Sequence, residues 1–273
     1  MKRMTTGRIL AALALLVAPA GIAAAKTADA PVIREAQHLN VNGVDEIWRL
    51  QWDRKPHPEC TPSVDPSWST RPCDPFAFGE AGPLSLIRLR NGSEYERLRL
   101  TGYFTEDDAT GTQATVQKHA PRKEDFDRQD GPTDQEIARR PLVRIMRFRD
   151  YDHDGHATEF MLPVANSIGF HQLAIVVGVS AANPHLHVFG TADAPDSALK
   201  LGPVEWKALA QGKPRVVSWV CGDHGSDIEN DLEFHTSKDG ISVTHLHYSC
   251  EAGGARGRQL SDDEISKLQH SAE

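Results

Sequence analysis

Beyond its first 25 residues, the sequence has no apolar run long enough to cross a membrane. It also has no glycine-rich phosphate-binding loop of the G-x-x-x-x-G-K-S/T or G-x-G-x-x-G kind. Positively charged residues are fewer than negatively charged ones: the sequence has 30 Lys and Arg residues and 38 Asp and Glu residues. These shortages argue against a membrane-spanning protein, a nucleotide-binding protein of those classes and a partner made of nucleic acid.

Cysteine is scarce as well, and no two of the four cysteines have the C-x-x-C spacing typical of a zinc site built from cysteines alone. An even number of cysteines in an oxidising compartment favours disulfides, for which three pairings are possible. We expect the two local pairings, Cys60–Cys73 and Cys221–Cys250.

The start of the chain has the features of a bacterial signal peptide over residues 1–25. Lys2, Arg3 and Arg8 precede a short apolar stretch at 9–20, and three alanines at 23–25 provide a cleavage site. Cleavage there removes three cations and no anion, which moves the net charge from −8 to −11. We therefore expect a periplasmic or secreted protein whose acidic surface suits the binding of cations.

Short segments of alternating or β-branched apolar residues predict strands, and turn dipeptides such as Asn91-Gly92 predict hairpins between them. The expected strands cover residues 44–52, 84–90, 93–103, 114–117, 142–148, 159–164, 173–179, 185–189, 215–219, 231–235 and 241–250. Helices are expected only from 133, over 204–210 and from 261. The fold class is therefore mainly β, either a β-sandwich or a β-rich α+β fold, with a few short helices and stabilising disulfides.

After the signal peptide, residues 26–273 are expected to form a single β-rich domain. Within it, residues 26–40 are predicted to be a loose N-terminal arm, and the charged stretch 118–131 an exposed loop. The continuous apolar run at 173–179 predicts a strand buried on both faces, at the centre of the core.

The most specific chemical pattern is Asp150-Tyr151-Asp152-His153-Asp154-Gly155. Carboxylates at alternate positions lie on the same side of a tightly curved loop, and glycine adopts the turn that other residues reach only with strain. Ca²⁺ takes six to eight oxygen ligands, so such a loop is typical of a calcium site. Further oxygens are expected from the backbone of His156, from Thr158 and from Glu159.

Over about ten residues this loop resembles the D-x-D-x-D-G calcium loops of EF-hand proteins and of dockerin-like and FG-GAP-type repeat proteins. The resemblance implies a bound Ca²⁺. Two departures limit it: loop position twelve is Met161 rather than a bidentate Glu, and the flanking residues predict strands rather than helices. Because the motif occurs once, a propeller of FG-GAP blades is not expected. Glu159 is the candidate replacement for the missing acid.

A second candidate metal site comes from His185-Leu186-His187 and His245-Leu246-His247. Residues two apart on a strand point to one face, so each pair could hold Zn²⁺ or copper if another strand supplied a third ligand. That ligand would come from Asp223, His224 or Asp227. The simpler interpretation is the polar face of a half-buried strand.

The leading hypothesis is an exported bacterial calcium-binding protein, a binding or envelope-associated module whose partner is a small molecule, a glycan or a protein. The alternative is a secreted Zn- or Cu-dependent hydrolase or oxidase that uses the paired histidines. Whether the protein is an enzyme stays open at this level.

Overall fold

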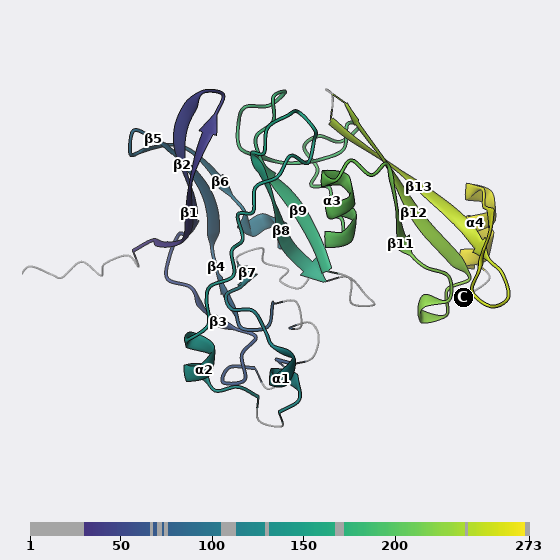
Figure 1. Cartoon of the computed structure of the whole chain (residues 1–273), viewed down its shortest axis with the longest axis horizontal. Coiled ribbons are helices and arrows are strands. Elements are labelled where there is room, and N and C mark those ends of the chain that lie inside the picture. The colour runs from purple at the N-terminus through teal and green to yellow at the C-terminus, as the bar shows by residue number, and fades with distance from the viewer. Residues whose placement is uncertain are drawn as a thin grey trace, which may run out of the picture.

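The computed structural model describes residues 30–65, 68–69, 73, 76–104, 113–128, 131–166, 172–237 and 240–270, apart from the side chains of His224 and residues 268–270. The predicted signal peptide lies outside these ranges. Within them the chain forms four antiparallel sheets and four short α-helices, which confirms the mainly β fold class (Figure 1).

The N-terminal sheet has the strand order β1-β2-β5-β6. Its strands are β1 (Val32–Val41), β2 (Val44–Trp52), β5 (Leu84–Arg90) and β6 (Ser93–Arg99). The predicted Asn91-Gly92 turn joins β5 and β6 with φ values of 50° and 79°, as a tight hairpin requires. The loose arm expected at 26–40 is wrong from Val32 onward, because this segment pairs with β2 along its whole length.

The central sheet packs against the N-terminal sheet and has the order β10-β9-β8. It is formed by β8 (Glu159–Asn166), β9 (Gln172–Gly178) and β10 (His187–Val188). Strand β9 is buried on both faces, as predicted. Ile175 and Val177 enter the core shared with the N-terminal sheet, whereas Ala174 and Val176 enter a second core.

The second core lies between the central sheet, helix α3 (Pro203–Ala210) and the C-terminal sheet (Figure 1). The C-terminal sheet contains β11 (Arg215–Trp219), β12 (Ile228–Ser237), β13 (Gly240–Cys250) and β14 (Arg256–Gln259), in sequence order. Helix α4 (Asp262–His270) follows it, and the 3-10 turn η3 (Asp223–Gly225) joins β11 to β12. Trp206 of α3 is fully buried and donates a hydrogen bond of 2.8 Å from its indole nitrogen to the Ala174 carbonyl of β9.

A small sheet of order β3-β4-β7 lies beside these layers. It and its neighbours comprise β3 (His57–Glu59), β4 (Gly79–Gly82), β7 (Ala114–Gln117), η2 (Thr101–Tyr103), α1 (Lys123–Phe126) and α2 (Asp134–Ala138). The exposed loop predicted at 118–131 is only partly correct. It contains α1, and its Asp125 is buried in an ion pair of 2.6 Å with Arg140.

The expected strand at 142–148 is a second correction. Apart from an isolated bridge between Leu142 and His119, this segment forms no ladder, and side chains of β1 bond much of its backbone. The guanidinium of Arg34 donates to the Val143 carbonyl, the carboxylate of Glu35 accepts from the amides of Ile145 and Met146, and the amide of Gln37 donates to the Met146 carbonyl.

Both expected disulfides are present, Cys60–Cys73 and Cys221–Cys250. Disulfides of this kind fit an extracellular or periplasmic protein. None of the helices in the described ranges has the length and apolar character needed to span a bilayer.

Candidate metal site

The loop after residue 149 is closed at its neck by two backbone hydrogen bonds. The amide of Arg149 donates to the carbonyl of Glu159 at 2.8 Å, and the amide of Glu159 donates back at 3.3 Å. Inside this neck Gly155 has a φ of 93°, which confirms the predicted turn. The chain therefore leaves the extended segment, folds into a compact loop and returns as β8.

Two side chains of the loop fix it on helix α3. The ring of Tyr151 is buried and meets Trp206 edge-on, with 5.7 Å between ring centroids. The Nε2 atom of His153 lies 2.7 Å from the Leu209 carbonyl. The loop is thus anchored to the second core through contacts with α3.

Three of the predicted ligands converge. One carboxylate oxygen from each of Asp150, Asp152 and Glu159 lies within 4.8 Å of the other two. Oxygens at calcium are about 2.4 Å from the ion, so two ligands of one ion are no more than about 4.8 Å apart. The three oxygens are therefore close enough to share one metal ion.

Asp150 supplies the clearest unsatisfied oxygen. Its Oδ2 accepts a hydrogen bond of 3.1 Å from the Gly155 amide, but its buried Oδ1 has no hydrogen-bond partner. A buried carboxylate oxygen without a partner costs free energy unless something balances it. A cation at the centre of the cluster would do so.

Glu159 is fully buried, although it is an acid. Burial, together with the charges of Asp152 and Asp154, raises its pKa to about 8, despite hydrogen bonds from the Tyr151 amide and the Thr158 side chain. The single Thr158 hydroxyl proton lies near both Glu159 and the Val179 carbonyl. A protonated Glu159 would donate to Thr158 and free that hydroxyl to donate to Val179.

Asp152 is shifted in the same direction. Burial, the neighbouring charges of Asp154 and Asp150 and a side-chain hydrogen bond shared with Asp150 raise its pKa to about 6, while a hydrogen bond from the Asp154 amide partly opposes the shift. Both acids therefore hold protons more tightly than isolated carboxyl groups, chiefly because they are buried and in addition because other acids lie close to them. A divalent cation would replace those protons.

Asp154 has a different role in the described geometry. It accepts from the amides of His156 at 2.8 Å and Ala181 at 2.6 Å, which ties the loop to the turn after β9. Thr158 is buried beside Glu159. The contribution of the His156 backbone carbonyl stays a prediction. The structure thus brings together Asp150, Asp152 and Glu159, and the hydrogen bonds of Asp154 hold the loop in place.

The paired histidines lie on different sheets, His187 on β10 and His245 and His247 on β13. In the first pair the ring of His185 approaches the Glu96 carboxylate, and that of His187 approaches the His185 carbonyl. In the second pair His247 contacts the Asn230 amide oxygen at 2.7 Å. Among the described side chains, no histidine belongs to a group of three potential metal ligands.

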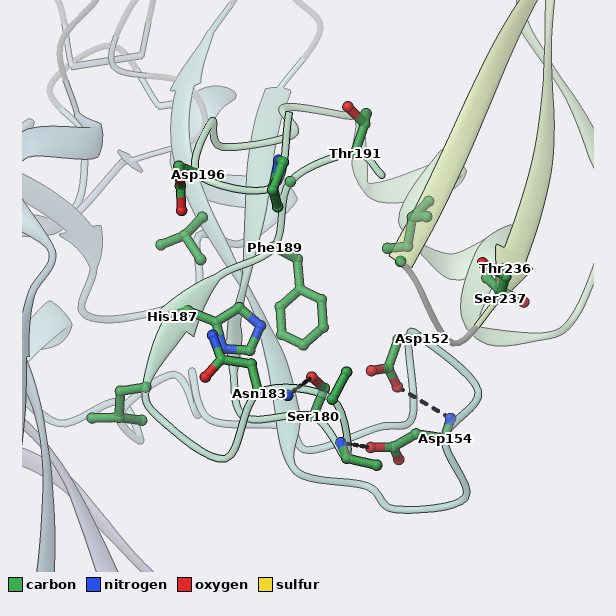
Figure 2. Close-up of a pocket in the computed structure, with 18 of the residues that line it drawn as sticks. Asp152, Asp154, Ser180, Asn183, His187, Phe189, Thr191, Asp196, Thr236 and Ser237 are labelled. Atoms are coloured by element: carbon green, nitrogen blue, oxygen red, sulfur yellow. Dashed lines mark hydrogen bonds between the residues drawn. The ribbon is translucent and has the colours of Figure 1, made fainter. Parts of the chain in front are cut away.

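A cavity of about 790 Å³ adjoins the acidic loop, which forms part of its wall (Figure 2). Its polar lining includes Asp152, Asp154, Ser180, Asn183, His187 and Asp196. Sequence analysis missed this cavity, because its walls come from segments between residues 98 and 241 that only the fold brings together.

The site is thus a compact acidic loop beside a ligand-sized cavity, on a scaffold of packed antiparallel sheets. Its donor set is entirely oxygen, which suits a hard divalent cation better than zinc or copper. No protein-family model matches this chain, and neither a curated protein nor a solved structure matches it.

Proposed function

We propose that the protein is an exported calcium-binding module whose loop at residues 150–159 holds one Ca²⁺. The observation that carries this proposal is the buried, partnerless Oδ1 of Asp150 within a cluster of three carboxylates. Without a cation, these acids repel one another and lose hydration at the same time. One divalent ion offsets both costs.

The ion would join two parts of the fold. Asp150 and Asp152 follow the extended segment that β1 holds, whereas Glu159 begins strand β8 of the central sheet. Three carboxylates leave room for backbone oxygens and water in a shell of six to eight ligands. An incomplete protein shell favours moderate affinity, with a Kd on the order of 10⁻⁴ M.

Export is supported by the two disulfides and by the basic and apolar start of the sequence. Calcium at the millimolar concentrations found outside cells would saturate such a site. In that setting we expect the ion to be a structural part of a binding or envelope-associated module.

Calorimetric titration of the chelator-treated protein with CaCl₂ tests the proposal. We expect one ion per chain and, at about a hundredfold excess over Kd, about 2.7 kcal/mol of added stability against unfolding. Asp150→Asn keeps the shape but lowers the charge, so we expect at least about tenfold weaker binding. Asp193→Asn, an exposed acid outside the cluster, is the matched control and should bind like wild type.

Absence of both binding heat and thermal stabilisation in the wild-type protein would end the calcium proposal. Metal analysis of the protein after mild chelation tests the alternative of a zinc or copper enzyme. Retention of zinc or copper, lost in a His245→Ala/His247→Ala variant, would favour that alternative. No cluster in the described residues supports it.

A further inference from the structure

The cavity beside the loop has acidic residues on two sides. Asp152 and Asp154 come from the loop, and Asp196 comes from the segment after β10, across the cavity (Figure 2). Asp196 is exposed and has no hydrogen-bond or ion-pair partner among the described residues. No Lys or Arg is found among the described residues that line the cavity. The described part of the lining therefore carries negative charge without a basic residue beside it.

Between these acids lies an aromatic surface. The rings of His187 and Phe189 are 4.5 Å apart at their centroids and tilted by 33°. Burial lowers the pKa of His187, which favours the neutral form of its imidazole. The half-buried His187 lies in the cavity wall with the ring of Phe189 beside it (Figure 2).

Apolar side chains complete the cavity, among them Leu98, Leu186, Val188 and Ile241. Its volume of about 790 Å³ is within the usual range for small-molecule sites, about 300–1,000 Å³. The lining thus combines three elements: carboxylates, a neutral aromatic face and an apolar floor.

We propose that this cavity binds a small organic cation, an ammonium group carried on an apolar or aromatic body. Even with Asp152 bound to the proposed ion, an anionic ligand would face the carboxylates of Asp154 and Asp196, with no Lys or Arg among the described lining residues to receive it. An ammonium group pairs with Asp196 or Asp154 and gains from the neighbouring rings, while the apolar body is buried against the floor. This inference goes beyond calcium binding, because Asp196 lies outside the proposed ion site.

A matched set of probes tests the charge requirement directly. Tryptamine is cationic, tryptophol replaces the ammonium by a hydroxyl, and indole-3-acetate carries a negative charge on the same ring. We expect tryptamine to bind at least about tenfold more tightly than tryptophol, and indole-3-acetate not to bind, in ligand-observed NMR with calcium present. Raising the salt concentration should weaken tryptamine binding.

Two variants locate the binding. Asp196→Asn should weaken tryptamine binding about threefold, and His187→Leu by a similar factor. Asp193→Asn is the control, because Asp193 is an exposed acid near Asp196 that does not line the cavity. Thermal unfolding of each variant establishes that it is folded.

Equal affinity for tryptamine and tryptophol would overturn the proposal. So would equal effects of Asp196→Asn and Asp193→Asn, since these would assign the attraction to the general acidity of the surface. Calcium titration of the Asp196→Asn variant separates the two proposals: it should bind the ion like wild type, whatever happens to the amine.

Discussion

At the scale of single residues, Glu159 is the most informative side chain. It takes part in the backbone bridge with Arg149 and is the innermost acid of the loop. Its position opposite Gly178 explains why β9 ends in glycine. A Cβ at that residue would lie 2.4 Å from the Thr158 carbonyl and 2.8 Å from the Glu159 Cα. The buried acid therefore depends on a close approach of two strands that only glycine permits.

The raised pKa of Glu159 predicts how the calcium-free protein responds to pH. In the unfolded chain this carboxyl loses its proton near its ordinary pKa of 4.5, but in the folded protein it keeps the proton up to about pH 8. Glu159 therefore contributes stability to the folded state that is fully present below pH 4.5 and is lost as the pH rises toward 8. The amide of Glu159→Gln does not titrate. In the presence of chelator, the stability of this variant should therefore rise relative to that of wild type between pH 5 and about pH 8.

Thermal unfolding of both proteins from pH 5 to 9 measures this difference. With calcium present, wild type should be the more stable of the two proteins, because it regains stability from the ion and the amide variant does not. A constant difference across the pH range would contradict the assigned protonation of Glu159.

At the scale of elements, a buried ion-pair network joins the N-terminal sheet to a cavity wall. Arg88 of β5 is 1% exposed and bonds Glu46 of β2 at 2.7 Å and 2.9 Å. It also bonds Glu96 of β6 and the Pro184 carbonyl, both at 2.7 Å. Glu96 in turn accepts from the amide of Leu186, a cavity residue. One guanidinium thus holds three strands and the turn before β10.

Arg88→Met should be strongly destabilising, because it leaves the fully buried carboxylate of Glu46 without its main partner. Breaking such a pair costs about 3 kcal/mol or more, measurable by urea unfolding. Arg90 also contacts Glu46 but is 43% exposed at its side chain, so Arg90→Met is the control and should cost about 1 kcal/mol or less. Equal losses in the two variants would show that burial is not what gives the network its strength.

The same network predicts that the protein loses stability at low pH. Burial raises the pKa of Glu46, but hydrogen bonds from Arg88, Arg90, Trp48 and Tyr95 outweigh it and lower the pKa to about 2. The stabilisation by Glu46 is therefore complete above pH 4.5 and is lost as the pH falls toward 2.

At the scale of the whole molecule, the two disulfides constrain regions at different ends of the layered structure. Cys60–Cys73 lies near the small sheet, and Cys221–Cys250 joins the end of β11 to the end of β13. The sequence separations are 13 and 29 residues, so the second bridge restricts the unfolded chain more. The core around β9 contains neither bridge.

Paired Cys→Ser substitutions test how each bridge contributes. Loss of Cys60–Cys73 should cost about 3 kcal/mol and loss of Cys221–Cys250 about 3.5 kcal/mol in denaturant unfolding. Both variants should keep their calcium site, which the bridges do not touch. Loss of calcium binding in either variant would show that the bridge also shapes the loop.

Local chemistry determined much of the fold. The Asn91-Gly92 hairpin, the β-branched run of β9, the helix over 204–210 and both local disulfide pairings are short-range features, and each was predictable from neighbouring residues. Gly155 belongs with them, because its positive φ follows from a tight turn after alternating acids.

The tertiary structure alone decided the features that depend on residues far apart in the sequence. Residues 142–148 have strand-like composition, yet side chains of β1 bond their backbone and no ladder forms. The convergence of Glu159 on Asp150 depends on the bridge at the loop's neck, and the placing of Asp196 and Asp152 in the wall of one cavity depends on how β10 follows β9. Sequence patterns report the local preferences of the backbone. Burial and cavities arise from the packing of segments far apart in the chain, which local preference does not specify.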